Sequence, residues 1–204
     1  TPVTAFLNVA SNAAAIVALV VLIFIAFPLA YDVYRPFLWV MAALTMTVGN
    51  VVALKQTNIV RMLAYSSVSQ GGFILMPLAV AFTNGNQGAS LRAVMVYLII
   101  YAATNLGAFA VVIAVSRKTR SGEISSFGGL FQYAPGLTVM MTIFLASLAG
   151  IPPLGGWYAK FGAFRAAVDA GGGWGYGIAV IAAVNAVIAT AYYISVMREM
   201  WMKP

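Results

Sequence analysis

The chain of 204 residues contains no cysteine and no histidine, and charged residues make up only 7% of it. Without thiolate or imidazole groups, the sequence offers no ligand set for zinc, haem or an iron–sulfur cluster, so any electron transfer connected with this protein must take place on another chain. Soluble domains carry about 25% charged residues, whereas hydrophobic residues reach 63% here. These shortages indicate an integral membrane protein.

Short polar segments divide the chain into apolar runs long enough to cross a membrane. Each crossing needs about 20 residues, so the chain has room for about six spans and for no separate soluble domain. The predicted spans are residues 4–30, 37–54, 62–82, 93–115, 137–164 and 174–197. We therefore predict an all-α integral membrane bundle that forms a single transmembrane domain.

The distribution of basic residues predicts the orientation of this bundle. Three arginines lie on the side opposite the amino terminus, namely Arg35, Arg92 and Arg165. The other side and the carboxy-terminal end hold Lys55, Arg61, Arg117, Lys118, Arg120, Arg198 and Lys203. The positive-inside rule then predicts that both ends face the cytoplasm. Topology also accounts for the net charge of +7, so a nucleic-acid partner is not expected.

The fifth predicted span contains a lysine directly after a segment that is unable to stay helical. Residues 147–160 read SLAGIPPLGGWYAK, with Pro152, Pro153 and three glycines within ten residues of Lys160. A charge at membrane depth costs on the order of 3 kcal/mol on insertion scales and indicates function by default. Because broken membrane helices beside buried charges commonly build ion sites, Lys160 is the leading candidate for an ion-carrying residue.

The acidic residues offer this lysine no partner within the predicted spans. All of them fall in loops or at span ends, namely Asp32, Glu123, Asp169 and Glu199. The counter-charge of Lys160 must therefore come from another chain, from sequence outside these residues, or from a chain of water molecules.

Three segments resemble the antiporter-like membrane subunits of respiratory complex I. Residues 49–70 read GNVVALKQTNIVRMLAYSSVSQ, residues 101–109 read YAATNLGAF, and residues 147–161 read SLAGIPPLGGWYAKF, all after an opening TPVTAF. Their order and sequence are most similar to the subunit N type of bacterial NADH-quinone oxidoreductase. The resemblance implies a fragment of a fourteen-helix subunit, which holds the second of two inverted five-helix units plus one helix of the first.

The resemblance also implies a function. In that family a mid-membrane axis of buried lysines and a glutamate relays protons, and Lys160 matches its terminal lysine. The implied protein is a proton-translocating, non-redox subunit in the bacterial plasma membrane. NADH, FMN, iron–sulfur clusters and quinone are expected on partner subunits of complex I, and neighbouring antiporter-like subunits and the lipid bilayer are the expected partners.

Two positions depart from the family pattern. Asn12 follows Ala-Ser where the family usually has a lysine, and Val60 replaces the lysine of a QTNIKR pattern. Lys55 is the obvious candidate to compensate for Val60, but five residues turn a helix through about 500° and leave the two positions about 140° apart. Compensation would therefore need a loop or a broken turn at Lys55. Since the amide of Asn12 cannot hold a charge, a relay through it would depend on bound water.

The candidates to line a hydrated path are Asn12, Lys55 and polar residues of the third and fourth predicted spans. In the third span these are Tyr65, Ser66 and Ser67; in the fourth, Tyr97, Tyr101, Thr104 and Asn105 share one helical face. Ordinary hydrogen bonding between helices explains the same residues.

The other candidate residues also have purely structural alternatives. Lys160 could cap the carbonyl groups of the broken helix near Gly150, and Lys55 could anchor the bundle at the interface. At the level of the whole chain, a structural subunit with an impaired relay remains an alternative, as does a related cation/proton antiporter or a membrane-bound hydrogenase subunit.

Overall fold

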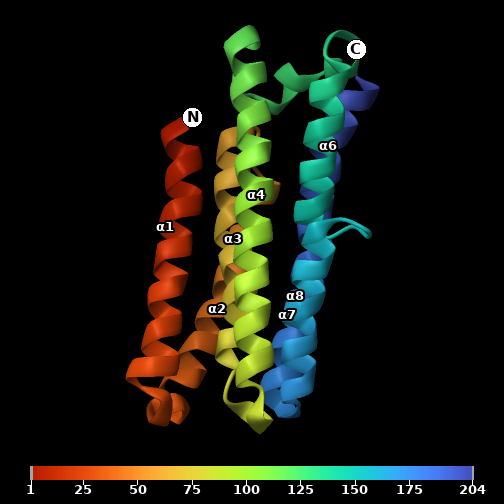
Figure 1. Cartoon of the computed structure of the whole chain (residues 1–204). Coiled ribbons are helices and arrows are strands. Elements are labelled where there is room, and N and C mark those ends of the chain that lie inside the picture. Colours follow the sequence, from red (N-terminus) through yellow and green to blue (C-terminus); the bar gives the residue numbers. More distant parts are fainter. Residues whose placement is uncertain (1, 204) are drawn as a thin grey trace.

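In lipid, a chain segment has to satisfy its own backbone N–H and C=O groups, and a helix does this within one segment. The computed structural model describes residues 2–203, and the long elements within that range are all helices (Figure 1). They are α1 (Pro2–Val21), α2 (Tyr31–Leu54), α3 (Ile59–Ala79), α4 (Gln87–Thr119), α6 (Pro135–Ala149), α7 (Gly155–Ala170) and α8 (Gly172–Met202). The all-helical membrane fold predicted from the sequence is confirmed.

Shorter helical pieces make the connections. A π-helical turn (Leu22–Ala26) and a 3-10 turn (Pro28–Ala30) join α1 to α2, and a 3-10 turn (Thr83–Gly85) precedes α4. Another 3-10 turn (Ile124–Phe127) and the single-turn α5 (Leu130–Tyr133) lead into α6.

The helices extend further than the predicted spans at several ends. The predicted fourth span, 93–115, lies inside α4 (Gln87–Thr119), and α2 begins at Tyr31 rather than at Phe37. The sequence prediction ended spans at charged residues, but arginine and lysine side chains can reach water while their backbone stays helical. Arg92, Arg117 and Lys118 therefore lie on α4 itself.

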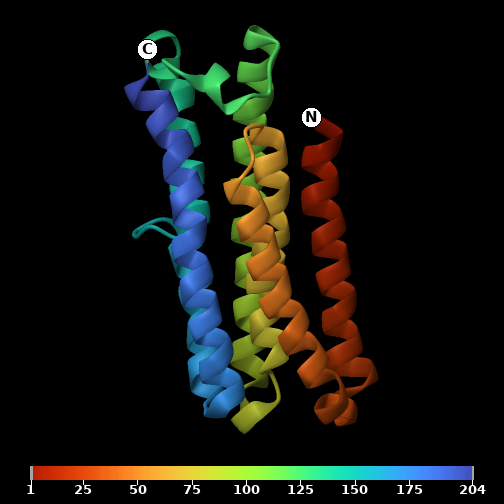
Figure 2. The same ribbon diagram turned by 180° about the vertical axis from the view of Figure 1, so that it is seen from behind.

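Helix α3 is the most enclosed of the long helices. Among residues 2–203, four segments are both long and apolar enough to cross a membrane, namely Phe6–Ala26, Pro28–Leu54, Gln87–Thr119 and Gly172–Met202. Helix α3 contains a polar stretch, 66–70, and is not one of these four. Figures 1 and 2 show it between α2 and α4, and it also contacts α1 and α7. Neighbouring helices thus bury the polar side chains of this stretch, namely Ser66, Ser67, Ser69 and Gln70.

Two glycines bring the backbones of α2 and α3 into direct contact. A Cβ atom added at Gly72 would lie 2.7 Å from the backbone nitrogen of Met46, and one added at Gly49 would lie 2.7 Å from that of Ser69. Both distances are shorter than real Cβ atoms tolerate, so glycine is required. This close packing fixes the polar stretch of α3 relative to α2.

The break predicted around Pro152 and Pro153 is confirmed. Helix α6 ends at Ala149, the next five residues leave the helix as a protruding loop, and α7 resumes at Gly155 (Figure 1). Gly150 adopts a left-handed backbone conformation with φ of 90°, which closes the last turn of α6. The backbone N–H of Gly156 donates to the Ser147 hydroxyl at 3.0 Å and so holds the two half-helices together.

Candidate functional site

Lys160 lies in the second turn of α7, beside the end of α6, and only 5% of the residue is exposed. Its Nζ atom donates to the carbonyl oxygens of Leu148 at 2.9 Å and Ala149 at 3.0 Å. The same atom lies 4.9 Å from the centroid of the Phe73 ring. The amine is therefore held by carbonyl dipoles and an aromatic face.

The two carbonyl groups are available because α6 ends there. The last four carbonyls of a helix lack partners within it and carry the negative end of the helix dipole. The carbonyls of Ala146 and Ser147 accept the backbone N–H of Gly150. The remaining two, those of Leu148 and Ala149, accept from Lys160. The helix break thus creates the site that accommodates a buried ammonium group.

No carboxylate forms an ion pair with Lys160 anywhere in residues 2–203. The two ion pairs in that range join Arg165 to Asp169 and Lys203 to Glu199. In the described part of the chain, the carbonyls of Leu148 and Ala149 therefore hold the Lys160 amine in place of a carboxylate.

Gln70 of α3 connects Lys160 to α4. Its Nε2 atom donates to the Leu148 carbonyl at 3.1 Å, so the amide shares an acceptor with the lysine. Its Oε1 atom accepts from the Tyr97 hydroxyl at 2.6 Å. Both ends of the amide are thereby fixed, and three helices meet at the lysine through it. Gln70 also reaches the Tyr193 hydroxyl of α8 at 3.4 Å.

A small cavity separates Lys160 from the middle of α4. It measures about 10 Å³, close to the minimum volume that holds one water molecule. Its lining consists of Gln70, Tyr97, Tyr101, Thr104, Ser147, Leu148, Gly156 and Lys160. This polar lining provides the two to four hydrogen-bond partners that a buried water needs.

A second, larger cavity lies among α1, α2, α3 and α4. It measures about 190 Å³, and the predicted path residues Asn12, Ser67 and Tyr101 line it. Tyr101 also lines the smaller cavity beside Lys160. The Tyr101 side chain therefore lies between two spaces that water can occupy. Its hydroxyl can both donate and accept a hydrogen bond, so it can interact with water on either side.

Hydrogen bonds hold Tyr101 in this position. The Asn105 amide donates to the Tyr101 hydroxyl at 3.1 Å and to the Ser67 hydroxyl at 3.3 Å. The Tyr101 hydroxyl lies 3.5 Å from the Asn8 carbonyl of α1. The structure therefore brings together Asn12, Ser67, Tyr101 and Asn105, which are distant in sequence.

The other predicted path residues lie outside this group. Lys55 is exposed at the end of α2, and Tyr65 is 39% exposed on α3. Neither lines either cavity. Ser66 is buried but donates to the Leu63 carbonyl of its own helix at 3.1 Å. Val60 is half-buried and packs against the core.

Gln70 and a second polar cluster are not among the site residues predicted from the sequence. In that cluster the Asn50 amide of α2 donates to the Asn185 side chain of α8 at 3.0 Å, and the Tyr192 hydroxyl donates to Asn50 at 3.1 Å. The available signal for Gln70 was its spacing, because it follows Ser67 by three residues and so shares a face of α3. Asn185 offered a similar signal as an amide within the last predicted span.

Comparison with known proteins adds the wider context. A family described as NADH:quinone oxidoreductase/Mrp antiporter, TM matches residues 1–186. NADH-quinone oxidoreductase subunit N of Trichlorobacter lovleyi is 40% identical over 205 residues, covering 100% of this chain and 40% of the relative. NADH-quinone oxidoreductase subunit N 1 of Herpetosiphon aurantiacus is 42% identical over 204 residues, with the same coverage of each.

Solved structures agree with these relatives. A chain of respiratory complex I from Thermus thermophilus with bound aureothin is 29% identical, with a TM-score of 0.66 over 83% of this chain and 36% of that chain. The sequence therefore spans about 40% of the length of the curated relatives it matches.

Proposed function

Because this chain belongs to the NADH:quinone oxidoreductase/Mrp antiporter membrane family, we propose that it forms part of a proton-translocating membrane-arm subunit of NADH-quinone oxidoreductase. It is a single transmembrane domain of a longer subunit, and that subunit is a non-redox part of a translocase. NADH, FMN, iron–sulfur clusters and quinone bind on partner subunits. The other partners are neighbouring antiporter-like subunits and the lipid of the bacterial plasma membrane, with both ends of this segment toward the cytoplasm.

The observation that carries the proposal is the position of Tyr101 between the two cavities. Asn12 lines one cavity and Lys160 the other, and Tyr101 lines both. Water in the two spaces would connect the lysine to α1 without any further charged residue in the path. The larger cavity is lined mostly by apolar residues, but Asn12, Thr45, Ser67 and Tyr101 offer hydrogen-bond partners for water within it.

In this proposal Lys160 holds and releases the proton. The carbonyls of Leu148 and Ala149 stabilise its charged form, and the cavity beside it supplies the water that receives or delivers the proton. Gln70 is a positioning residue, since it bonds to the Leu148 carbonyl and is itself oriented by Tyr97.

A specific observation also favours the structural alternative. The Lys160 amine bonds to both carbonyls left free at the end of α6, which is the contact expected of a helix cap. Together with Asn12 in place of a lysine, this contact would suit a subunit that only bridges its neighbours. An antiporter of the Mrp type is the third candidate, because the family description includes it.

The test is NADH-driven proton pumping by the reconstituted complex with Lys160 replaced. Lys160→Met removes both the charge and the cap, whereas Lys160→Gln removes the charge but retains an amide donor. We expect both variants to lower the number of protons moved per NADH, with Lys160→Gln remaining assembled. Lys118→Met, which removes an exposed lysine, is the matched control.

The outcomes separate the three candidates. Wild-type pumping by Lys160→Gln would establish the cap as the whole role of the lysine and refute the relay. If the Lys160 variants lose sodium transport and keep proton transport, the antiporter type is favoured.

A further inference from the structure

A cleft of about 300 Å³ lies between α4 and α7, and it shares no lining residue with the two cavities of the polar path. This volume is at the lower limit of ligand-binding pockets, which measure about 300–1,000 Å³. Its lining includes Arg92, Ala93, Tyr158, Phe161, Gly162 and Arg165. The proposed proton path makes no use of it.

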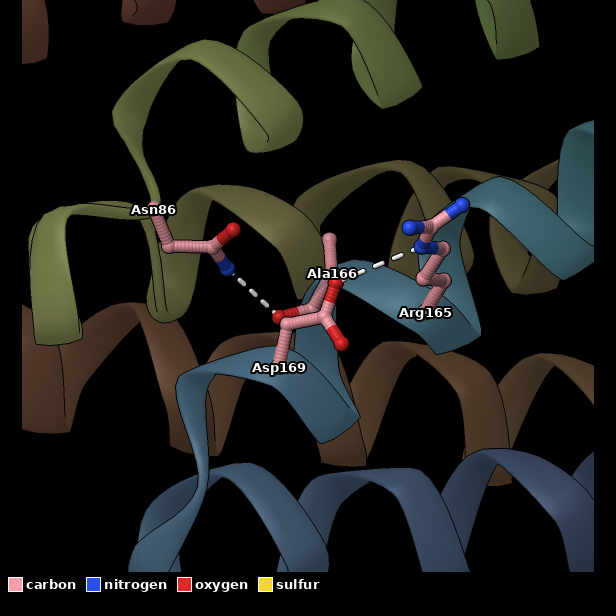
Figure 3. Close-up of polar contacts among 4 residues, drawn as sticks. All are labelled: Asn86, Arg165, Ala166 and Asp169. Carbon is pink, nitrogen blue, oxygen red and sulfur yellow. Dashed lines mark hydrogen bonds and ion pairs between the residues drawn. The ribbon is translucent and has the colours of Figure 1, made fainter.

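One end of the cleft is basic. Arg92 comes from α4 and Arg165 from α7, and Asp169 is the acidic residue in the lining. Asp169 pairs with Arg165 at 3.4 Å (Figure 3). The Asp169 side chain is 50% exposed and that of Arg165 is 72% exposed. Exposed pairs of this kind are weak. Arg92 makes no ion pair with any of residues 2–203, so the cleft keeps an excess positive charge.

The two arginines lie at matching depths. Arg92 follows the start of α4 at Gln87 by five residues, and Arg165 precedes the end of α7 at Ala170 by five. At a rise of 1.5 Å per residue, each lies about 7.5 Å inside its helix end. Long arginine side chains at this depth reach the headgroup region of a bilayer.

The other end of the cleft is apolar and faces outward. Tyr158 and Phe161 are 60% and 51% exposed, and Ala93 and Val96 line the α4 side. From Asp169 to Tyr158 the α7 side extends roughly 16 Å along the helix. The cleft therefore has the polarity of an amphiphile, with charge at the helix ends and apolar surface toward the membrane centre.

The loop before α4 fixes the shape of the charged end. The Asn86 amide donates to the Ala166 carbonyl at 2.6 Å (Figure 3). The Asn84 amide donates to the Ala170 carbonyl at 2.8 Å. Because these bonds tie the start of α4 to the end of α7, the two arginines are held on either side of one opening before any ligand arrives.

The geometry points to a binding site for one anionic phospholipid in this cleft. The phosphate pairs with Arg92 and Arg165 and competes with Asp169 for the latter, and an acyl chain follows the apolar groove past Gly162. The length and polarity of the groove favour a lipid over a free anion, which would need only the charged end.

The test is lipid retention by the intact complex after detergent purification, followed by rebinding of phosphatidylglycerol. Each basic residue near a membrane surface contributes about fivefold to the binding of anionic lipid. We therefore expect an Arg92→Gln and Arg165→Gln double variant to bind phosphatidylglycerol about thirtyfold more weakly. Arg61→Gln with Arg117→Gln, two exposed arginines at the opposite end, is the matched control and should bind as the wild type does.

A second variant tests the groove without changing the charge. A Cβ atom added at Gly162 meets only the Ala93 Cβ at 3.9 Å, so Gly162→Leu fills the cleft without a backbone clash. It should also lose the lipid, whereas Ala110→Leu, at an exposed position of α4 outside the cleft, should keep it.

Three results would overturn the proposal. The first is equal retention of phosphatidylglycerol and phosphatidylcholine by the wild type, which would show that the arginines do not select for an anionic headgroup. The second is displacement of the lipid by inorganic phosphate at equal concentration. The third is a wild-type complex with no bound lipid at this cleft, which would mean that a neighbouring subunit covers it.

Discussion

The two ends of the polar path differ in how tightly they are packed. Beside Lys160 the cavity measures about 10 Å³, and Lys160, Gln70 and Tyr97 all have hydrogen-bond partners. Beside Asn12 the cavity measures about 190 Å³. Near that end, two buried polar atoms, Asn8 Nδ2 and Asn105 Oδ1, have no partner within residues 2–203.

The buried charge and the larger cavity thus lie at opposite ends of the polar path. The buried charge is found where the packing is tight and the carbonyls of a broken helix can hold it. The roomy end has an amide, Asn12, in place of a charge. Because unpartnered buried polar atoms usually bind ordered water, we interpret the larger cavity as the hydrated end of the path.

The largest effect is expected at the tight end, where Gly156 lies under the end of α6. A Cβ atom at this position would collide with the Ser147 carbonyl oxygen. Gly156→Ala should therefore push the half-helices apart and cost about 3 kcal/mol, at the upper end of typical overpacking. Thermal unfolding of the purified complex measures this.

Gly136→Ala is the control for this change. A Cβ atom added there meets nothing within 4 Å, so its effect should stay within about 0.5 kcal/mol. Equal stability of the two variants would show that α6 and α7 are not packed as described.

The next effect is expected at the junction of the two ends. Tyr101→Phe removes the hydroxyl of the residue that lines both cavities but keeps its ring. We expect the proton-pumping rate to fall about tenfold, less than the hundredfold or more typical of a group that itself transfers the proton in catalysis. Assembly should be retained. Tyr176→Phe, which removes a hydroxyl from a residue lining neither cavity, should pump normally, and equal rates for the two variants would contradict the junction.

The sequence predicted the tight end better than the roomy one. Hydropathy predicted the helices, and the prolines and glycines around Pro152 predicted the break, because these are local properties of the chain. Ser147 to Lys160 lie close together in the sequence, so the broken helix and its lysine could be linked directly. Gln70 could not be linked to the lysine from the sequence, because its contact with Leu148 depends on how α3 packs against α6 and α7.

The larger cavity at the other end of the path arises only from the packing of several helices. Tyr101 was a candidate from its polarity and helical spacing, but the sequence offered no means to predict that it borders two cavities. Polarity alone also suggested a role for Tyr65, which is 39% exposed and lines neither cavity. Cavities arise from side chains on several helices, so periodicity along one helix does not predict them.

The smallest effect is expected at the roomy end itself. Asn12→Leu would make one wall of the larger cavity apolar and remove a partner for water, but the other polar residues of the lining would remain. We expect pumping to fall about threefold, which corresponds to roughly 0.7 kcal/mol. Asn12→Ser, which keeps a hydrogen-bonding group at this position, is the control and should pump close to the wild-type rate. Unchanged pumping by Asn12→Leu would show that water beside α1 takes no part in the path, and the functional part of the chain would then end at Tyr101.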